Sequence, residues 1–98
     1  MRGSGEVIDF EWDAGNRGKN LKKHGVTDAE SEEAFFDSGK KIFKDVVHSE
    51  IEERSILVGQ TKAGKMLFIA FTSRKTRIRI ISSRPLNKKE KQLYGKKT

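Results

Sequence analysis

The sequence contains no cysteine and only one proline, and it has no long apolar stretch. The absence of cysteine excludes disulfides, thiolate metal sites and thiol nucleophiles. No apolar run approaches the roughly 18 residues that cross a bilayer, and no charged-then-apolar leader stands at the start. We therefore expect a soluble, cytoplasmic protein that is held together by a hydrophobic core.

Hydrophobic residues are also scarce, since they make up 34% of the 98 residues while charged residues make up 36%. This composition leaves room for one small core. We expect a single domain over residues 1–98. Residues 1–5 resemble the start of an expression tag, and we expect them to take no part in the fold.

Acidic residues are nearly absent from the last quarter of the chain. Residues 74–98 hold ten basic residues and one acidic residue, Glu90, for a net charge of +9, whereas residues 1–73 carry −2. The overall charge of +7 therefore belongs to one end of the chain. Positive charge concentrated in this way favours a phosphate backbone as a partner.

The patterns of apolar and polar residues predict an α+β domain in the order β-α-α-β-β-β-α. We expect an antiparallel sheet with a helical hairpin on one face and a C-terminal helix. Its strands are predicted at residues 6–12, 53–60, 65–73 and 76–84, with a possible short strand within 42–47. The segment 65–73 is apolar on both faces, which is typical of a central strand.

Capping residues predict where the helices begin and end. A first helix is expected over 13–23, capped by Asp13 and ended by Gly25. Two further helices open with a capping box, in which a cap side chain and a carboxylate three positions later satisfy each other's backbone amides. These pairs are Thr27 with Glu30 and Asn87 with Glu90.

The arginines of the last strand are the strongest candidates for a functional site. Arg77 and Arg79 alternate with isoleucines, so they share one face, and that face should be open because burying an unpaired guanidinium is costly. Guanidiniums bind phosphate through paired hydrogen bonds, and Arg84 and Arg54 are placed to join them. The alternative is a solvated, ion-paired face, which the shortage of acids in residues 74–98 disfavours.

Lys23 and His24 are candidates for proton transfer at the end of the first helix, where the helix dipole favours a positive charge. The alternative for His24 is a role as a helix cap, and His48 is expected to be a solvated loop residue. The two histidines lack the spacing of a ligand pair, so we predict neither a metal site nor a cofactor.

The C-terminal helix adds further candidates for binding nucleic acid. Tyr94 can stack on a base or pack against the sheet. The residues that we predict to contact RNA from this end of the chain are Arg84, Lys88, Lys89, Lys91 and Tyr94.

A series of short motifs between about residues 8 and 94 resembles the BrnT-like toxins of bacterial type II toxin–antitoxin systems. The motifs are Phe10-Glu11-Trp12-Asp13, Asn20 with Lys23-His24-Gly25-Val26, Glu53-Arg54, Arg77 to Arg84, and Glu90 with Tyr94. The resemblance implies the fold of the RelE ribonucleases, a metal-independent ribonuclease activity, and a partner antitoxin that also binds DNA. The chain departs from the family pattern after Asp13, where the family usually has proline followed closely by lysine, and Lys19 is displaced.

We therefore predict a toxin that cleaves RNA and inhibits translation. The ribose 2′-hydroxyl would attack the adjacent phosphate, which Arg54, Arg77 and Arg79 would hold, while Lys23 or His24 would move protons. The expected partners are RNA and a cognate BrnA-like antitoxin, with DNA contacted only through the antitoxin and no membrane contact. The alternative is a non-enzymatic module of the same fold that binds nucleic acid or protein, and a metal-dependent hydrolase is a third interpretation.

Overall fold

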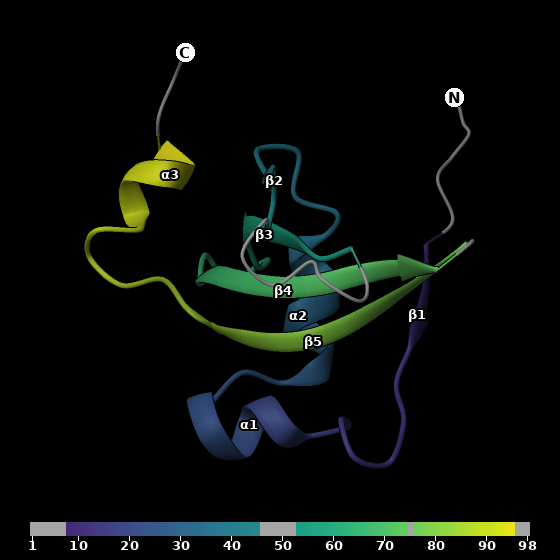
Figure 1. Ribbon diagram of the computed structural model, residues 1–98. Coiled ribbons are helices and arrows are strands. Elements are labelled where there is room, and N and C mark those ends of the chain that lie inside the picture. The colour runs from purple at the N-terminus through teal and green to yellow at the C-terminus, as the bar shows by residue number, and fades with distance from the viewer. Residues whose placement is uncertain (1–7, 46–52, 75, 96–98) are drawn as a thin grey trace.

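Figure 1 shows the computed structural model of the protein, which describes residues 8–45, 53–74 and 76–95. The elements along these residues are β1 (Asp9–Glu11), α1 (Lys19–His24), α2 (Asp28–Ala34), β2 (Lys41–Lys44), β3 (Ser55–Gln60), β4 (Met66–Arg74), β5 (Arg77–Pro85) and α3 (Lys91–Gly95). The predicted α+β class is confirmed. Within the described residues, none of the helices has the length and apolar character to span a bilayer.

The strands form one sheet in the order β1-β5-β4-β3-β2. β4 lies at its centre, as the apolar run predicted, and β2 to β5 pair antiparallel. β1 instead runs parallel to β5, with Asp9 opposite Arg77 and Glu11 opposite Arg79. This pairing brings acidic residues from the start of the chain beside the basic strand near its end.

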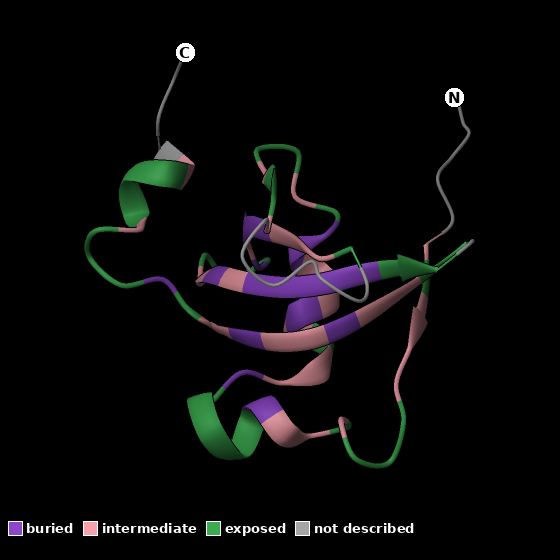
Figure 2. Ribbon diagram, viewed as in Figure 1, coloured by how far each residue is buried: buried purple, intermediate pink, exposed green. Residues whose placement is uncertain are grey.

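One face of the sheet carries the hydrophobic core under α2. Leu57, Leu67 and Ile69 are fully buried there and belong to one cluster with residues of α2. Figure 2 shows the buried residues as a band along β4, whereas β5 is buried only at Ile80 and Ser83. A Cβ atom added to Gly59 would lie 2.7 Å from the carbonyl oxygen of Ala34, so only glycine allows α2 to approach β3 this closely.

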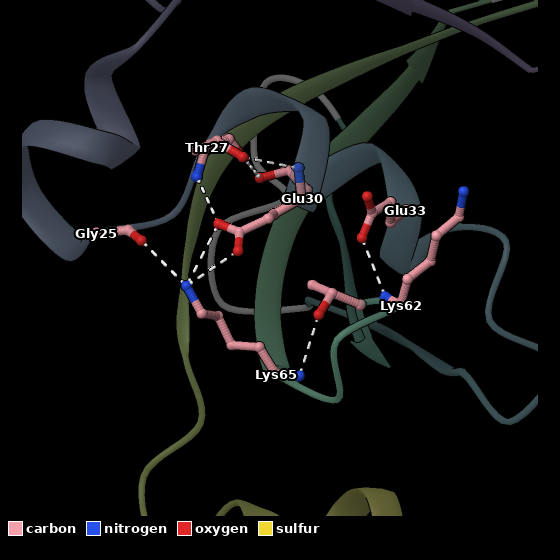
Figure 3. A network of polar contacts seen from close by, with 8 residues as sticks. Gly25, Thr27, Glu30, Glu33, Lys62 and Lys65 are labelled. Atoms are coloured by element: carbon pink, nitrogen blue, oxygen red, sulfur yellow. Dashed lines mark hydrogen bonds and ion pairs between the residues drawn. The ribbon is translucent and has the colours of Figure 1, made fainter.

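A polar network joins the two N-terminal helices to the turn before β4 (Figure 3). Gly25 ends α1 at a φ of 72°, and Thr27 and Glu30 form the predicted capping box at the start of α2. The Lys65 ammonium lies 3.2 Å from the Gly25 carbonyl oxygen and 3.1 Å from a Glu30 carboxylate oxygen. The hydrogen bond from the Thr27 amide lowers the pKa of Glu30, although burial opposes it.

α3 is held at both ends to the rest of the fold. The predicted capping box is present, since Asn87 and Glu90 bond each other's backbone amides at 2.8 and 3.0 Å. At the other end, the Tyr94 hydroxyl donates a 2.8 Å hydrogen bond to Asp37 and lies 3.4 Å from the side-chain oxygen of Gln60. These contacts join α3 to β3 and to the segment that follows α2.

The predicted boundaries differ from the structure mainly in the first third of the chain. Turns occupy residues 14–18, and α1 begins only at Lys19. The residue before it is Gly18, which has no side chain to cap the helix. The prediction that Asp13 caps this helix is wrong, because its carboxylate pairs with Arg79 instead. The short strand that the sequence left open is present as β2, so the sheet has one strand more than the predicted order. His48 and residues 1–5 lie outside the described residues.

Candidate functional site

Two neighbouring hollows lie on the sheet face opposite the core. The charged hollow has a volume of about 420 Å³ and is lined by Asp13, Gly15, Asn16, Lys19, Arg54, Thr72, Arg79 and Ile81. The apolar hollow has a volume of about 360 Å³ and is lined by Asp45, Arg54, Ile56, Phe68, Ala70, Ile81 and Ser82. Because Arg54 and Ile81 line both, the two hollows adjoin each other.

Arg79 enters the charged hollow from β5, directly opposite Thr72 of β4. Its guanidinium lies 2.9 Å from a carboxylate oxygen of Asp13. Asp13 stands just beyond β1, and the parallel pairing of Glu11 with Arg79 carries it to this position. The ion pair therefore depends on the sheet register, and the sequence around either residue does not show that register.

A β-bulge in β5 provides carbonyl oxygens that accept hydrogen bonds from two other residues of the charged hollow. Ala70 pairs with Ser82 and Phe71 pairs with Ile80, so Ile81 is the extra residue. The Lys19 ammonium donates a 2.9 Å hydrogen bond to the carbonyl oxygen of Ile81, and the side-chain amide of Asn16 donates to that of Ile80. The bulge thus holds Lys19 and Asn16 at the hollow.

Arg54 immediately precedes β3 and lines the charged hollow. The backbone next to it is held in place, since the buried Thr72 hydroxyl donates a 2.9 Å hydrogen bond to the Glu53 carbonyl oxygen. The Arg54 carbonyl oxygen in turn accepts the Asp45 amide at 2.9 Å. Arg54, Lys19 and Arg79 therefore come from three separate segments and meet at one hollow, which they line with one carboxylate, Asp13.

The other two arginines of β5 lie outside this hollow. Arg77 pairs with Asp9 at 3.2 Å on the rim of the sheet, and both side chains are 57% exposed. Arg84 lies 4.2 Å above the ring of Phe68, and Glu90 binds it through two 2.8 Å hydrogen bonds. These bonds raise the pKa of Arg84 and lower that of Glu90, in both cases against the effect of burial.

The expectation that these arginines would lack acidic partners was therefore wrong. It counted only the acids within residues 74–98, whereas Asp9 and Asp13 come from the other end of the chain. The face is open, as predicted, but its guanidiniums are oriented by carboxylates. An oriented guanidinium keeps its charge and presents its remaining N–H donors in a defined direction.

Lys23 and His24 line neither hollow, and both are exposed on α1. Because an α-helix turns once in 3.6 residues, Lys23 follows Lys19 by one turn on the same face, while His24 is rotated away from it. Among the described residues, no three histidine or acidic side chains gather in a group that would hold a metal ion.

The remaining RNA candidates lie around α3. Lys88, Lys89 and Lys91 are exposed there. Tyr94 is half-buried and bonded to Asp37, and burial together with this bond raises its pKa. The Tyr94 hydroxyl therefore helps to hold α3, and stacking of the ring on a base stays a prediction.

Comparison with known families adds a separate finding. Residues 12–90 match the model of the ribonuclease toxin BrnT of type II toxin–antitoxin systems. The chain belongs to this family. No curated protein matches the chain. The matched region contains all the residues of both hollows, and membership of a type II system implies that a protein antitoxin neutralises the BrnT toxin.

Sequence reasoning missed four polar side chains of the charged hollow: Asp13, Asn16, Lys19 and Thr72. Lys19 was noticed only as a displaced member of the family pattern, and Asp13 was assigned to a helix cap. The signal that would have found them is the parallel pairing of β1 with β5, which places the residues after β1 beside the bulge. Neither strand carries that pairing as a local pattern.

Proposed function

We propose that the charged hollow is the active site of an endoribonuclease. The observation that carries this proposal is the meeting of Lys19, Arg54 and Arg79 at one hollow on the open sheet face. Three cations from separate rigid segments match the charge of a phosphodiester whose negative charge increases during reaction. Membership of a ribonuclease toxin family supports RNA as the substrate.

In this mechanism the ribose 2′-oxygen attacks the adjacent phosphorus. The bond from phosphorus to the 5′-oxygen breaks as the new bond forms, which leaves a 2′,3′-cyclic phosphate and a 5′-hydroxyl. Arg54 and Arg79 stabilise the charge on the non-bridging oxygens, and Asp13 keeps the Arg79 guanidinium oriented. Arg77 was predicted to share this role, and its position at the rim supports only a peripheral one.

Two proton movements accompany this step, one from the 2′-hydroxyl and one to the 5′-oxygen. We predicted Lys23 or His24 for them, and both remain proposals. Lys23 has the better position because it follows Lys19 on the same helix face. Lys19 itself lines the hollow, so its amine is a further candidate for proton transfer.

We further propose that cleavage is independent of metal ions, because the chain supplies the positive charge that a metal ion would otherwise provide. The test is cleavage of RNA by the purified protein in excess EDTA. Activity should persist at the level seen without EDTA. Activity that disappears with EDTA and returns with magnesium would instead favour the metal-dependent interpretation, and no cleavage under either condition would favour a non-enzymatic module.

The biological consequence that we propose is inhibition of translation through loss of RNA. A BrnA-like antitoxin would neutralise the toxin by covering the face that carries Arg79, and DNA would be contacted only through that partner. Induction of the chain in bacteria should then stop growth and degrade RNA, and co-expression of the antitoxin should restore both.

A further inference from the structure

We propose that the apolar hollow is a nucleobase subsite, which receives one of the two bases that flank the phosphate in the charged hollow. The inference rests on the proposed function for the identity of the phosphate, but it concerns a separate set of side chains. Its basis is the contrast between two adjoining hollows on one sheet face, one lined by cations and the other mainly by apolar side chains.

The apolar hollow arises from the sizes of side chains in one cross-strand row. Ile56 of β3, Ala70 of β4 and Ser82 of β5 stand opposite one another and therefore share a face. Ala70 is the middle member and Ser82 is also small, so two small side chains form the floor beside Ile56. Phe68 and Ile81 form the walls. Phe68 lies two residues before Ala70 on β4, and Ile81 is the extra residue that the bulge adds to β5.

One wall of this hollow is held rigidly before any ligand arrives. The Arg84 guanidinium lies over the Phe68 ring at 4.2 Å, and Glu90 fixes that guanidinium with two hydrogen bonds of 2.8 Å. An apolar hollow with an aromatic wall suits a planar base, which has two apolar faces. Ser82 and Asp45 also line the hollow, and both are residue types that can form hydrogen bonds with the polar edge of a base.

The apolar hollow lies next to the charged hollow, and this position is the reason to expect a base as its occupant. Arg54 and Ile81 line both hollows, so a group that leaves the charged hollow enters the apolar one directly. In a nucleic acid the group attached through the sugar to a phosphate is a base. A phosphate bound by Lys19, Arg54 and Arg79 would therefore bring a neighbouring base to the apolar hollow.

The test uses binding, with 2′-deoxydinucleotides that cannot be cleaved by attack of a 2′-hydroxyl. Three probes are compared: one with both bases, one without the 5′ base and one without the 3′ base. Backbone amide signals of the protein are followed by NMR. The full dinucleotide should shift the signals of Arg79 and of Ala70 and Ser82. Removal of one particular base should abolish the Ala70 and Ser82 shifts, keep the Arg79 shift and weaken binding roughly tenfold.

Ala70→Leu fills the hollow and should weaken binding of the full dinucleotide to the level of the abasic probe. Ala63→Leu is the matched control, since Ala63 is exposed in the turn before β4 and lines neither hollow; it should bind like the wild type. Ala70→Val serves as the second variant if thermal unfolding shows that the leucine variant is not folded.

The proposal is overturned if Ala70→Leu binds the full dinucleotide as tightly as the wild type, or if no probe shifts Ala70. It is also overturned if both abasic probes shift Ala70 as the full dinucleotide does. RNA cleavage by the wild type is measured separately. A protein that binds the probes as described but does not cleave RNA would keep the subsite and refute the ribonuclease proposal.

Discussion

Arg77 and Arg79 show how two identical residues on one strand face acquire different surroundings. Both pair with an acid from the start of the chain, at 3.2 Å for Arg77 and 2.9 Å for Arg79. The Arg77 side chain is 57% exposed on the rim, whereas the Arg79 side chain is 35% exposed and lines the charged hollow. The difference comes from the turns that follow β1, which build a wall beside one arginine only.

Replacement of the two arginines by alanine should separate these roles. Arg79→Ala should slow RNA cleavage by about 10²–10³-fold, because it removes one charge contact to the reacting phosphate. Arg77→Ala should cause a much smaller loss. Both should change the free energy of unfolding by no more than about 1 kcal/mol, since each removes a partly exposed ion pair.

The measurements are single-turnover cleavage rates and denaturant unfolding of each variant. Equal losses of activity would show that the rim arginine acts in the reaction after all. An unchanged rate in Arg79→Ala would remove the charged hollow from consideration as the active site.

α3 illustrates how a very short helix is kept in place at the scale of an element. Its five residues could not form a stable helix alone, because helix nucleation is costly. Glu90 ties its beginning to Arg84, and Tyr94 ties its end to Asp37. Both anchors use a carboxylate, so the attachment of α3 depends on ionised acids.

Acid should therefore release α3 before it unfolds the sheet. The hydrogen bond with Arg84 lowers the pKa of Glu90 against the effect of burial. Burial raises the pKa of Asp37, but bonds from Gly39, Tyr94 and Gln60 outweigh it, and the net shift is downward. A lowered folded-state pKa stabilises the fold above the ordinary value of the group, about 4, and that stability is lost as the pH falls through the lowered pKa.

Amide hydrogen exchange of residues 91–95 measured between about pH 5 and about pH 2 tests this prediction. After correction for the intrinsic exchange rate, protection of α3 should fall with pH ahead of protection in β4. Glu90→Gln should weaken protection already at pH 5 and reduce its dependence on pH. Protection that is the same at both ends of the range would show that the anchors do not depend on charge.

At the scale of the whole molecule, folding partly redistributes the charge that the sequence concentrates at one end. Asp9 and Asp13 are carried to the basic strand, so the arginine face is less positive than residues 74–98 alone suggest. Lys88, Lys89 and Lys91 nevertheless remain exposed near Arg84. The charged hollow and these lysines lie towards opposite ends of β5, which favours a long polyanion or a large acidic surface as a partner.

We expect the antitoxin and RNA to compete for this face. A titration of the protein with labelled 2′-deoxy-substituted RNA should show release of the RNA when the cognate antitoxin is added. Association with the antitoxin should slow as salt is raised from about 50 to about 200 mM, because electrostatic steering is screened. Independent binding of both ligands would show that neutralisation acts through another surface.

Features that depend on neighbouring residues could be predicted from the sequence. The capping boxes of Thr27 and Asn87 and the end of α1 at Gly25 involve groups within a few positions of each other. The central place of β4 also followed from the sequence, since a strand covered on both sides must be apolar on both faces. The arginines of β5 were found for the same reason, because alternation along a strand is a local pattern.

Only the tertiary structure decided which of these side chains meet. The parallel pairing of β1 with β5 joins the two ends of the chain and brings Asp13 and Lys19 to Arg79. A local pattern sets the face on which a side chain lies, but the partner across the sheet depends on register and on a single bulged residue, Ile81. The sequence by itself therefore determined most of the elements and the charge of this toxin, whereas the packing of distant strands determined where its charged hollow lies.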